Sequence, residues 1–399
     1  MITFIAANFI VILACRKEHT LEMKKILYIS NILAHINSFH IPYIEMLRKN
    51  GYDVDVIANS CGELPKERCY RYYDVPIERS PFSPKNLSAY GKIKNIIDGN
   101  EYDLIHVHTP MGSVLGRLAA KRARKRGTKV IYTSHGFHFY KGAPIFNNIV
   151  YYCTERYLSK YTDAIIVINK EDFNAAKKFV PDDCKLFFMN GVGVDLSKCH
   201  CRDKERQAAL KKQYGYEQNV IVLYAAEFIK RKNHKFLITA FSEVFRQHPD
   251  VRLLLAGKGP LQKEMQRLTD SLGLNECISF LGYRRDVPEL LKMADFTVST
   301  SRQEGFPINV AESIASYVPA VVSDIRGNTD IIENGYNGLL YRKNDKSDFI
   351  SKAGTLIHDS KLRETMSVQC EDTAKKIDIN RLVSVMIEIY SNYIEFGEN

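Results

Sequence analysis

Short apolar runs alternate with amphipathic stretches along the chain from Lys24 onward. In the first half, five runs are typical of buried strands: residues 25–30, 53–58, 103–108, 129–133 and 164–168. Helical periodicity lies between them, for example in residues 41–49, which stop before Gly51, and in residues 113–126. Strands that alternate with helices at this spacing predict a parallel sheet that is covered on both faces.

A second series of apolar runs follows a polar, charged stretch at residues 199–218. Its predicted strands are residues 220–225, 251–256, 277–281, 296–299 and 320–323. A chain of 399 residues also exceeds what one hydrophobic core usually supports. We therefore predict an α/β protein with two Rossmann-like, doubly wound parallel-sheet domains, 23–200 and 201–378, which face a cleft at their strand carboxyl ends. An amphipathic helix at 379–396 is expected to bring the C-terminal segment, 379–399, back to the first domain.

Residues 1–22 form an N-terminal extension whose first fifteen residues are largely apolar. The apolar part is too short to span a bilayer as a helix, and it lacks the basic start and small-residue cleavage site of a signal peptide. Two interpretations stay open. Translation begins naturally at Met23, or the extension is a shallow interfacial anchor. No later segment is long and apolar enough to span a membrane.

The charge balance favours an anionic partner, since 56 Lys and Arg residues against 46 Asp and Glu residues give a formal charge of +10. Much of the excess is local: Arg117, Lys121, Arg122, Arg124, Lys125, Arg126 and Lys129. This stretch is interpreted either as a solvated helix face or as a surface attracted to an anionic membrane. Nucleic acid is a weaker candidate because the cations are not interleaved with stacking aromatic residues.

Candidate metal ligands are present but poorly placed. The nine cysteines are scattered and odd in number, which is not a disulfide framework. The Cys199-His200-Cys201 fragment has no second ligand pair at a suitable spacing. Asp53 and Asp55 lie inside a predicted strand, and His106 and His108 lie at a strand end, so structural roles are favoured. The sequence therefore predicts no metal site.

The most informative segment is residues 299–312, where a predicted strand is followed by a polar loop and a helix. Pro307 suits the first helical turn, and Gly305 permits a tight loop that approaches a ligand closely. Backbone amides at this helix start would face an anion such as a diphosphate. Glu304 and Glu312 could accept hydrogen bonds from sugar hydroxyls. The alternative is that Glu304 caps the helix and Glu312 is solvated.

Glu304 and Glu312, with seven residues between them, resemble the Glu-x7-Glu motif of the retaining GT-B glycosyltransferases of family 4. The similarity extends from about residue 24 to the C-terminus and includes Gly282-Tyr283-Arg284 and residues 335–339. The resemblance implies that Glu312 binds the ribose hydroxyls and that Glu304 contacts the donor sugar. It also makes the second domain the nucleotide-sugar side and the first domain the acceptor side.

A basic stretch at residues 225–234 directly follows a predicted strand. Cations there could neutralise charge that develops on a departing diphosphate, although a solvent-exposed basic turn is the common alternative. The family resemblance assigns Lys232 to the diphosphate. It also usually places an arginine where this chain has Glu227, so Arg231 or Arg302 is a candidate replacement.

In the first domain, His135 follows a predicted strand and matches the family's cleft histidine. It could hydrogen-bond a sugar or phosphate oxygen without acting as a full general base. His138 is either an acceptor-side residue or part of the loop packing. Residues 30–40 replace the glycine-rich loop of many relatives and resemble members that act on lipid-diphosphate-linked sugars. Asn37 and His40 are accordingly assigned to the acceptor side.

Together these features predict a retaining, metal-independent hexosyltransferase that needs no cofactor. It would move a hexose or N-acetylhexosamine from a UDP-sugar to a lipid-linked saccharide in surface polysaccharide or glycan biosynthesis. We expect a cytoplasmic protein, peripheral at the anionic inner face of the plasma membrane, with no nucleic-acid partner. The expected catalytic residues are His135, Lys232 and Glu304. The expected donor-binding residues are Arg231, Lys232, Tyr283, Glu304, Gly305, Phe306, Pro307, Ile308, Asn309 and Glu312.

Two alternatives remain open: a GT-B nucleotide-sugar 2-epimerase, which needs no acceptor, and a non-catalytic nucleotide-sugar-binding protein, which Glu227 favours. A dehydrogenase is disfavoured because no Gly-x-Gly-x-x-Gly follows the first predicted strand.

Overall fold

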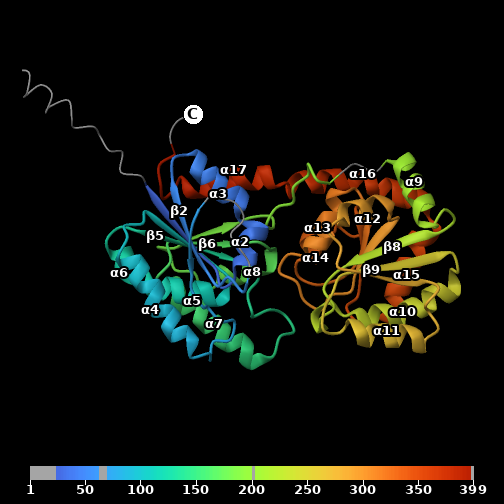
Figure 1. Cartoon of the computed structure of the whole chain (residues 1–399), viewed down its shortest axis with the longest axis horizontal. Coiled ribbons are helices and arrows are strands. Elements are labelled where there is room, and N and C mark those ends of the chain that lie inside the picture. The colour runs from blue at the N-terminus through green and yellow to red at the C-terminus, as the bar shows by residue number, and fades with distance from the viewer. Residues whose placement is uncertain (1–23, 63–69, 200–202, 397–399) are drawn as a thin grey trace, which may run out of the picture. The chain divides into compact units, whose positions relative to one another are not determined.

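Two parallel sheets form the framework of the chain in a computed structural model that describes residues 24–62, 70–199 and 203–396 (Figure 1). Seven strands are ordered β3-β2-β1-β4-β5-β6-β7, and six are ordered β10-β9-β8-β11-β12-β13. In each sheet the order reverses beside the first strand of the series, β1 or β8, which is the doubly wound arrangement. The predicted fold class, α/β with two doubly wound parallel sheets, is confirmed.

The strands are β1 Lys25–Ile29, β2 Asp53–Ala58, β3 Arg71–Asp74, β4 Leu104–His108, β5 Lys129–Ser134, β6 Ala164–Val167, β7 Lys185–Phe188, β8 Val220–Ala225, β9 Val251–Ala256, β10 Ile278–Gly282, β11 Phe296–Ser299, β12 Ala320–Ser323 and β13 Gly338–Tyr341. The helices are α2 Leu33–Phe39, α3 Ile41–Lys49, α4 Lys85–Asp98, α5 Pro110–Ala119, α6 Lys121–Lys125, α7 Ile145–Ser159, α8 Lys170–Ala176, α9 Lys204–Tyr214, the 3-10 helix η1 Lys230–Lys232, α10 His234–Gln247, α11 Gln262–Ser271, α12 Val287–Met293, α13 Ile308–Ala315, α14 Asn328–Ile331, α15 Lys346–His358, α16 Ser360–Lys376 and α17 Ile379–Tyr390.

The chain divides into two compact units, which are described separately. Unit 1 comprises residues 1–132, 161–164 and 390–399, and unit 2 comprises residues 133–160 and 165–389. The boundary predicted near residue 200 falls on residues 200–202, outside the described part of the chain, as does the extension at residues 1–22. The predicted domain ranges therefore stay a prediction. His200 and Cys201 of the Cys-His-Cys fragment also lie outside the described residues.

In unit 1, strand β1 lies between β2 and β4 with parallel register, from Lys25 opposite Asp53 to Ile29 opposite Ile57 on the β2 side. The four residues from Ile26 to Ile29 are fully buried, as expected for a parallel strand covered on both faces. Asp55 on β2 accepts hydrogen bonds from the hydroxyls of Tyr102, at 2.7 Å, and Tyr73, at 3.3 Å. This carboxylate therefore has the structural role that its strand position predicts.

The buried hydroxyl of Tyr390 connects the end of α17 to β1 and β4 within unit 1. It lies 2.6 Å from the Tyr28 hydroxyl and 2.6 Å from Nδ1 of His106, and all three side chains are buried. Burial lowers the pKa of His106 to about 3, so the imidazole is neutral at physiological pH. The helix predicted for residues 379–396 ends here, six residues earlier than expected.

In unit 2, alternate residues of β8 pack on opposite faces of the six-stranded sheet. Val222 and Tyr224 belong to one apolar cluster, whereas Ile221 and Leu223 belong to another. This alternation follows from the two-residue period of a strand, and it explains the unbroken apolar run in the sequence.

The strand predictions are most accurate in the centre of the sheets. Residues 220–225, 251–256, 296–299 and 320–323 coincide with β8, β9, β11 and β12. Strands β3, β7 and β13 were not predicted, and each lies at an edge of its sheet. Strands β3 and β7 have no fully buried residue, so their sequences lack the apolar run that marks a central strand. The helix predicted at residues 113–126 is two helices, α5 and α6, which separate at Ala120.

The basic stretch from Arg117 to Lys129 is not one solvated surface. Arg117 is fully buried and its guanidinium lies over the Tyr132 ring, 4.2 Å from the centroid. Arg124 forms an ion pair with Asp163 at 3.1 Å. The interpretation as a continuous solvated or membrane-facing surface is therefore wrong for these two cations, because aromatic and acidic partners within unit 1 hold them.

Replacing the Tyr390 hydroxyl should destabilise unit 1. Tyr390→Phe leaves the buried His106 Nδ1 and Tyr28 hydroxyl without this partner, at a cost of about 1–3 kcal/mol in unfolding free energy. Scanning calorimetry should show a lower melting temperature for this variant than for the control Tyr214→Phe, whose side chain is 44% exposed. Equal melting temperatures would contradict the assigned role.

Candidate functional site

Residues predicted to bind the donor meet at one edge of the six-stranded sheet. Strands β8 and β11 are parallel neighbours, so their carboxyl ends lie at the same edge. Lys232 is in η1, shortly after β8, and Glu304 is in the loop after β11. The fold thus brings together two segments that are about seventy residues apart in the chain.

Glu304 binds two cations at this edge. Its Oε1 lies 2.6 Å from Nζ of Lys232, and its Oε2 lies 2.5 Å from Nη1 of Arg231. The Glu304 side chain is only 4% exposed, so these charge-assisted hydrogen bonds offset the cost of burying its charge. The two cations and one carboxylate carry a formal net charge of +1. This arrangement of three predicted residues can attract a phosphate group.

Helix α13 begins beside this cluster. Pro307 occupies the N-cap, one residue before the predicted first turn, and no side chain caps the helix. The alternative in which Glu304 is a helix cap is therefore wrong. The buried Oδ1 of Asn309 has no hydrogen-bond partner among the described residues. The first turn therefore offers polar groups of its own in addition to backbone amides.

Glu312 lies in the second turn of α13 and is not fully solvated. Burial raises the pKa of its carboxyl group to about 7. The alternative interpretation as a solvated surface glutamate is therefore wrong. A carboxylate with this pKa changes charge near physiological pH, which makes its ability to accept hydrogen bonds sensitive to pH.

Two glycines allow the Glu304 loop to touch the segment that carries His135. A Cβ atom on Gly305 would lie 2.0 Å from the carbonyl oxygen of His135, and one on Gly136 would lie 3.0 Å from Cα of Gly305. Gly136 also has a φ of +128°, a conformation that L side chains rarely adopt. The predicted catalytic residues His135 and Glu304 are thus on adjoining loops of unit 2.

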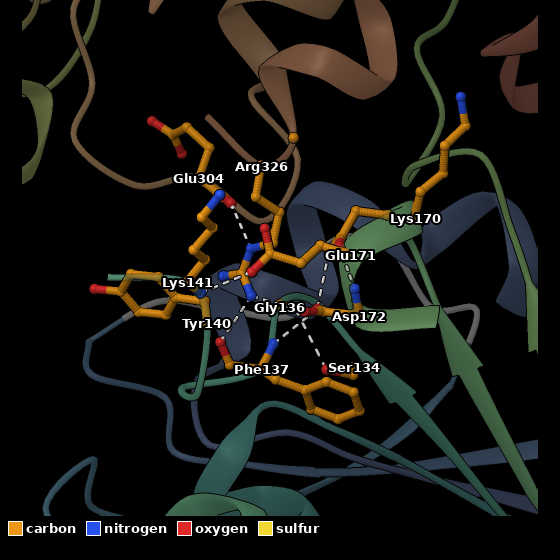
Figure 2. Close-up of polar contacts among 12 residues, drawn as sticks. Ser134, Gly136, Phe137, Tyr140, Lys141, Lys170, Glu171, Asp172, Glu304 and Arg326 are labelled. Carbon is orange, nitrogen blue, oxygen red and sulfur yellow. Dashed lines mark hydrogen bonds and ion pairs between the residues drawn. The ribbon is translucent and has the colours of Figure 1, made fainter. Parts of the chain in front are cut away.

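Arg326, which the sequence analysis did not identify, holds both loops (Figure 2). Its Nε donates to the backbone carbonyl of Glu304 at 3.1 Å, and its Nη1 donates to the carbonyl of Phe137 at 3.1 Å. The same Nη1 lies 2.7 Å from Oδ1 of Asp172. Figure 2 shows the Glu304 side chain directed away from Arg326, so the guanidinium fixes the backbone and leaves the carboxylate to other partners.

Asp172, in α8, completes this arrangement. Its carboxylate is 1% exposed and also accepts the backbone N–H of Phe137 at 2.8 Å. Burial raises its pKa, while the Arg326 charge and these hydrogen bonds oppose that shift. One feature of the sequence could have pointed to Arg326 as a site residue: it lies shortly after a predicted strand and directly before Gly327.

The remaining residues predicted to bind the donor differ in burial, and Phe306 is buried. Tyr283 follows β10 and is 63% exposed. Of the two candidates to replace the family arginine, Arg231 reaches Glu304, whereas the backbone N–H of Arg302 donates to the Arg231 carbonyl at 2.8 Å. Glu227 is exposed. Arg231 is therefore the better placed cation.

Asn37 and His40, the unit 1 residues predicted to lie on the acceptor side, are in and directly after α2. The Asn37 side chain is buried and its Oδ1 accepts the Tyr70 hydroxyl at 3.1 Å. His40, 4% exposed, has its ring 4.0 Å from that of His108 and 5.0 Å from that of His35. Burial lowers the pKa of His35 to about 4. His35 and His108 carry no sequence signal for this cluster, because only the fold brings the end of β4 beside α2.

His138, in unit 2, is exposed, and its ring lies 5.2 Å from that of Tyr151 on α7. This contact belongs to the packing of the loop, which is one of the two roles considered for His138.

Two protein families match the chain. The family described as Glycosyl transferases group 1 matches residues 205–372, and that described as Glycosyl transferase 4-like matches residues 25–169. The Bacillus subtilis protein named "Putative glycosyltransferase EpsD" is 38% identical over 373 residues, which cover 93% of this chain and 97% of that protein. The Escherichia coli UDP-Gal:alpha-D-GlcNAc-diphosphoundecaprenol alpha-1,3-galactosyltransferase is 26% identical, with 92% and 95% covered.

A solved structure has the same fold. Anabaena Alr3699/HepE in complex with UDP and glucose superposes with a TM-score of 0.74 at 19% identity, and the match covers 92% of this chain and all of that chain. The predicted GT-B architecture is thus shared with a crystal structure.

Breaking the Arg326–Asp172 pair should destabilise unit 2 strongly. Arg326→Met leaves the buried Asp172 carboxylate without its cation, which we expect to cost about 3–5 kcal/mol in unfolding free energy. The double variant Arg326→Met/Asp172→Asn should regain part of this loss, because it removes both charges and leaves no unpaired charge in the interior.

Arg342→Met is the matched control, because it removes an exposed arginine that pairs with Asp345 on the surface. Chemical denaturation should give a change within about 1 kcal/mol for this control. A single Arg326 variant as stable as the control would contradict a structural role for the buried pair.

Proposed function

Because this chain belongs to the family of group 1, 4-like glycosyltransferases, we propose that it transfers a hexose or N-acetylhexosamine from a UDP-sugar to a lipid-diphosphate-linked saccharide. The protein is a glycosyltransferase related to enzymes that build lipid-linked polysaccharides. The E. coli relative, named for a UDP-linked donor and an undecaprenol-linked acceptor, supports the choice of both substrates. The proposed site of action is the cytoplasmic face of the plasma membrane, in surface polysaccharide or glycan biosynthesis.

The observation that carries the proposal is the pairing of Lys232 and Arg231 with one nearly buried carboxylate. Two cations at the carboxyl ends of the strands can stabilise the negative charge that develops on a departing diphosphate. A carboxylate between them can accept hydrogen bonds from the hydroxyls of the sugar attached to that diphosphate. When the donor binds, the ion pairs of Glu304 with Lys232 and Arg231 are exchanged for contacts with the donor. The two cations then bind the diphosphate, and Glu304 binds the sugar.

We propose transfer with retention and without a metal ion. The acceptor hydroxyl attacks the anomeric carbon on the face from which the diphosphate leaves, and its proton passes to the leaving phosphate oxygen. The bond from the anomeric carbon to the phosphate oxygen breaks, and a bond to the acceptor oxygen forms. Two cations neutralise much of the Glu304 charge, which makes this carboxylate a weak nucleophile. The role of a hydrogen-bond acceptor suits it better. The amides at the start of α13 would support the diphosphate, and Glu312 would accept the ribose hydroxyls.

The direct test is transfer by the purified full-length chain. A panel of UDP- and GDP-sugars is offered with undecaprenyl-diphosphate saccharides, with and without EDTA, and the anomeric configuration of the product is read by NMR. Transfer from a UDP-sugar that survives EDTA and retains configuration is expected. An inverted product or EDTA sensitivity would overturn the proposed mechanism. Conversion of the UDP-sugar without acceptor would identify a 2-epimerase, and nucleotide binding without turnover would identify a binding protein.

UDP affinity should depend on pH through Glu312. The carboxyl group, with its pKa of about 7, is largely protonated at pH 6, whereas the ionised form is the better acceptor for ribose hydroxyls. UDP binding should therefore weaken as the pH falls below 7, by at most about tenfold per pH unit. Isothermal titration from pH 6 to pH 8 measures this slope.

Glu312→Gln should bind UDP more weakly than the wild type at pH 8 and with little change across this range, since the amide does not titrate. An equal pH slope in both proteins would mean that another group is responsible.

A further inference from the structure

Helix α7 of unit 2, labelled in Figure 1, carries a stripe of exposed apolar residues. The stripe consists of Ile145, Phe146, Ile149, Val150, Cys153 and Tyr157. Phe146 is 75% exposed and Ile149 is 58% exposed. Spacings of three and four residues place Phe146, Ile149, Val150, Cys153 and Tyr157 on one side of the helix. A contiguous apolar surface of this kind marks an interaction site, whereas singly exposed apolar residues do not.

The opposite side of α7 already anchors the helix. Oδ1 of Asn148 accepts the backbone N–H of Tyr140 at 3.1 Å. The Tyr152 ring lies 5.5 Å from that of Phe139 and 5.4 Å from that of Phe179, in edge-to-face contacts. These contacts hold the inner side of α7, whereas Ile145, Phe146 and Ile149 on the outer side are more than half exposed.

The charges around the stripe select the kind of partner. The single acidic residue of α7 is Glu155, which is buried, whereas Lys141, Arg156 and Lys160 are exposed near the stripe. Glu171 of α8 lines the adjoining hollow, but it is half-buried and accepts the backbone N–H of Lys141 at 2.9 Å. An apolar helix face with cations and no exposed acid suits the boundary between headgroups and acyl chains of an anionic bilayer. In a symmetric dimer built on α7, the same cations would meet without acidic partners on the helix.

A hollow of about 580 Å³ connects the stripe to the candidate site. Ile149 and Cys153 of the stripe line it, together with Phe139, Tyr140 and Lys178. Phe139, Tyr140 and Lys141, which line this hollow, belong to the loop after His135, and Arg326 holds that loop at Phe137. Contact of the stripe with a bilayer would therefore place lipid beside the loop that leads to His135.

We propose that the outer stripe of α7 is the surface by which this protein docks on an anionic membrane. The inference rests on the proposed function, because a lipid-linked acceptor is held at such a surface. In this proposal the α7 stripe is the membrane-docking surface, and not the basic stretch at residues 117–129. In the described part of the chain, no helix has both the length and the apolar character to cross a bilayer, so the proposed contact is interfacial.

The absence of tryptophan from the chain allows a clean fluorescence test. Phe146→Trp in the full-length protein should show a blue-shifted emission with vesicles of phosphatidylcholine and phosphatidylglycerol, and quenching by brominated acyl chains. The control Tyr214→Trp, on the exposed end of α9, should show neither effect. Emission from Phe146→Trp that stays unchanged with these vesicles would overturn the proposal.

Loss-of-function variants test the same surface by vesicle flotation. Phe146→Ser/Ile149→Ser should weaken binding to anionic vesicles roughly tenfold or more, because the contact then loses two apolar side chains that the bilayer would bury. The matched control Leu272→Ser/Val368→Ser, also at exposed apolar positions, should bind like the wild type. Equal binding by both double variants would overturn the proposal. So would a wild-type dimer, seen by analytical ultracentrifugation, that the α7 variant dissociates.

Thermal stabilisation by UDP separates this inference from the proposed function. If UDP stabilises every variant but the α7 substitutions leave vesicle binding unchanged, the docking surface is wrong and the proposed donor stands. If vesicle binding depends on α7 but no nucleotide stabilises the protein, the proposed donor is wrong and the docking surface stands.

Discussion

The buried guanidinium of Arg326 holds together three segments of unit 2 that are distant in the sequence. A charge with 8% exposure needs close partners, and it has them in the Asp172 carboxylate and the carbonyls of Phe137 and Glu304. The direct contact of Gly136 with Gly305 fits the same arrangement, since any side chain there would meet backbone. The position of the Glu304 loop, and with it the donor-side ion pairs, therefore depends on one buried pair that lies outside the recognisable motif.

At the predicted donor-binding edge of the six-stranded sheet, one carboxylate lies between two cations. Glu304 holds Lys232 and Arg231 at a single place, so both cations are close together before a diphosphate approaches. The same pairing competes with the donor for both cations. In the proposed mechanism, affinity for the nucleotide and stabilisation of the leaving group therefore depend on the same exchange of partners. Glu312, whose pKa burial raises to about 7, adds a pH-dependent contact to this edge in the proposed complex.

The sequence was sufficient for features that depend on local pattern. Apolar-rich runs identified central strands such as β8 and β9, and the Glu-x7-Glu spacing made Glu304 and Glu312 candidate site residues. Edge strands β3 and β7 escaped because half-exposed strands carry no such run. Arg117 was counted as a surface cation, yet it is buried over Tyr132, a contact set by packing between a helix and a strand. Arg326 and Asp172 are 154 residues apart, and no local pattern reports a pair at that separation.

The most direct test of the proposed exchange of partners is the affinity of UDP for Glu304→Gln, measured by isothermal titration beside the wild type. Removing the carboxylate charge frees Lys232 and Arg231 for the diphosphate, so we predict tighter binding of UDP together with slower sugar transfer. Weaker binding of UDP by the variant, or transfer at the wild-type rate, would contradict the assignment of Glu304 as both the partner of these cations and the contact of the donor sugar.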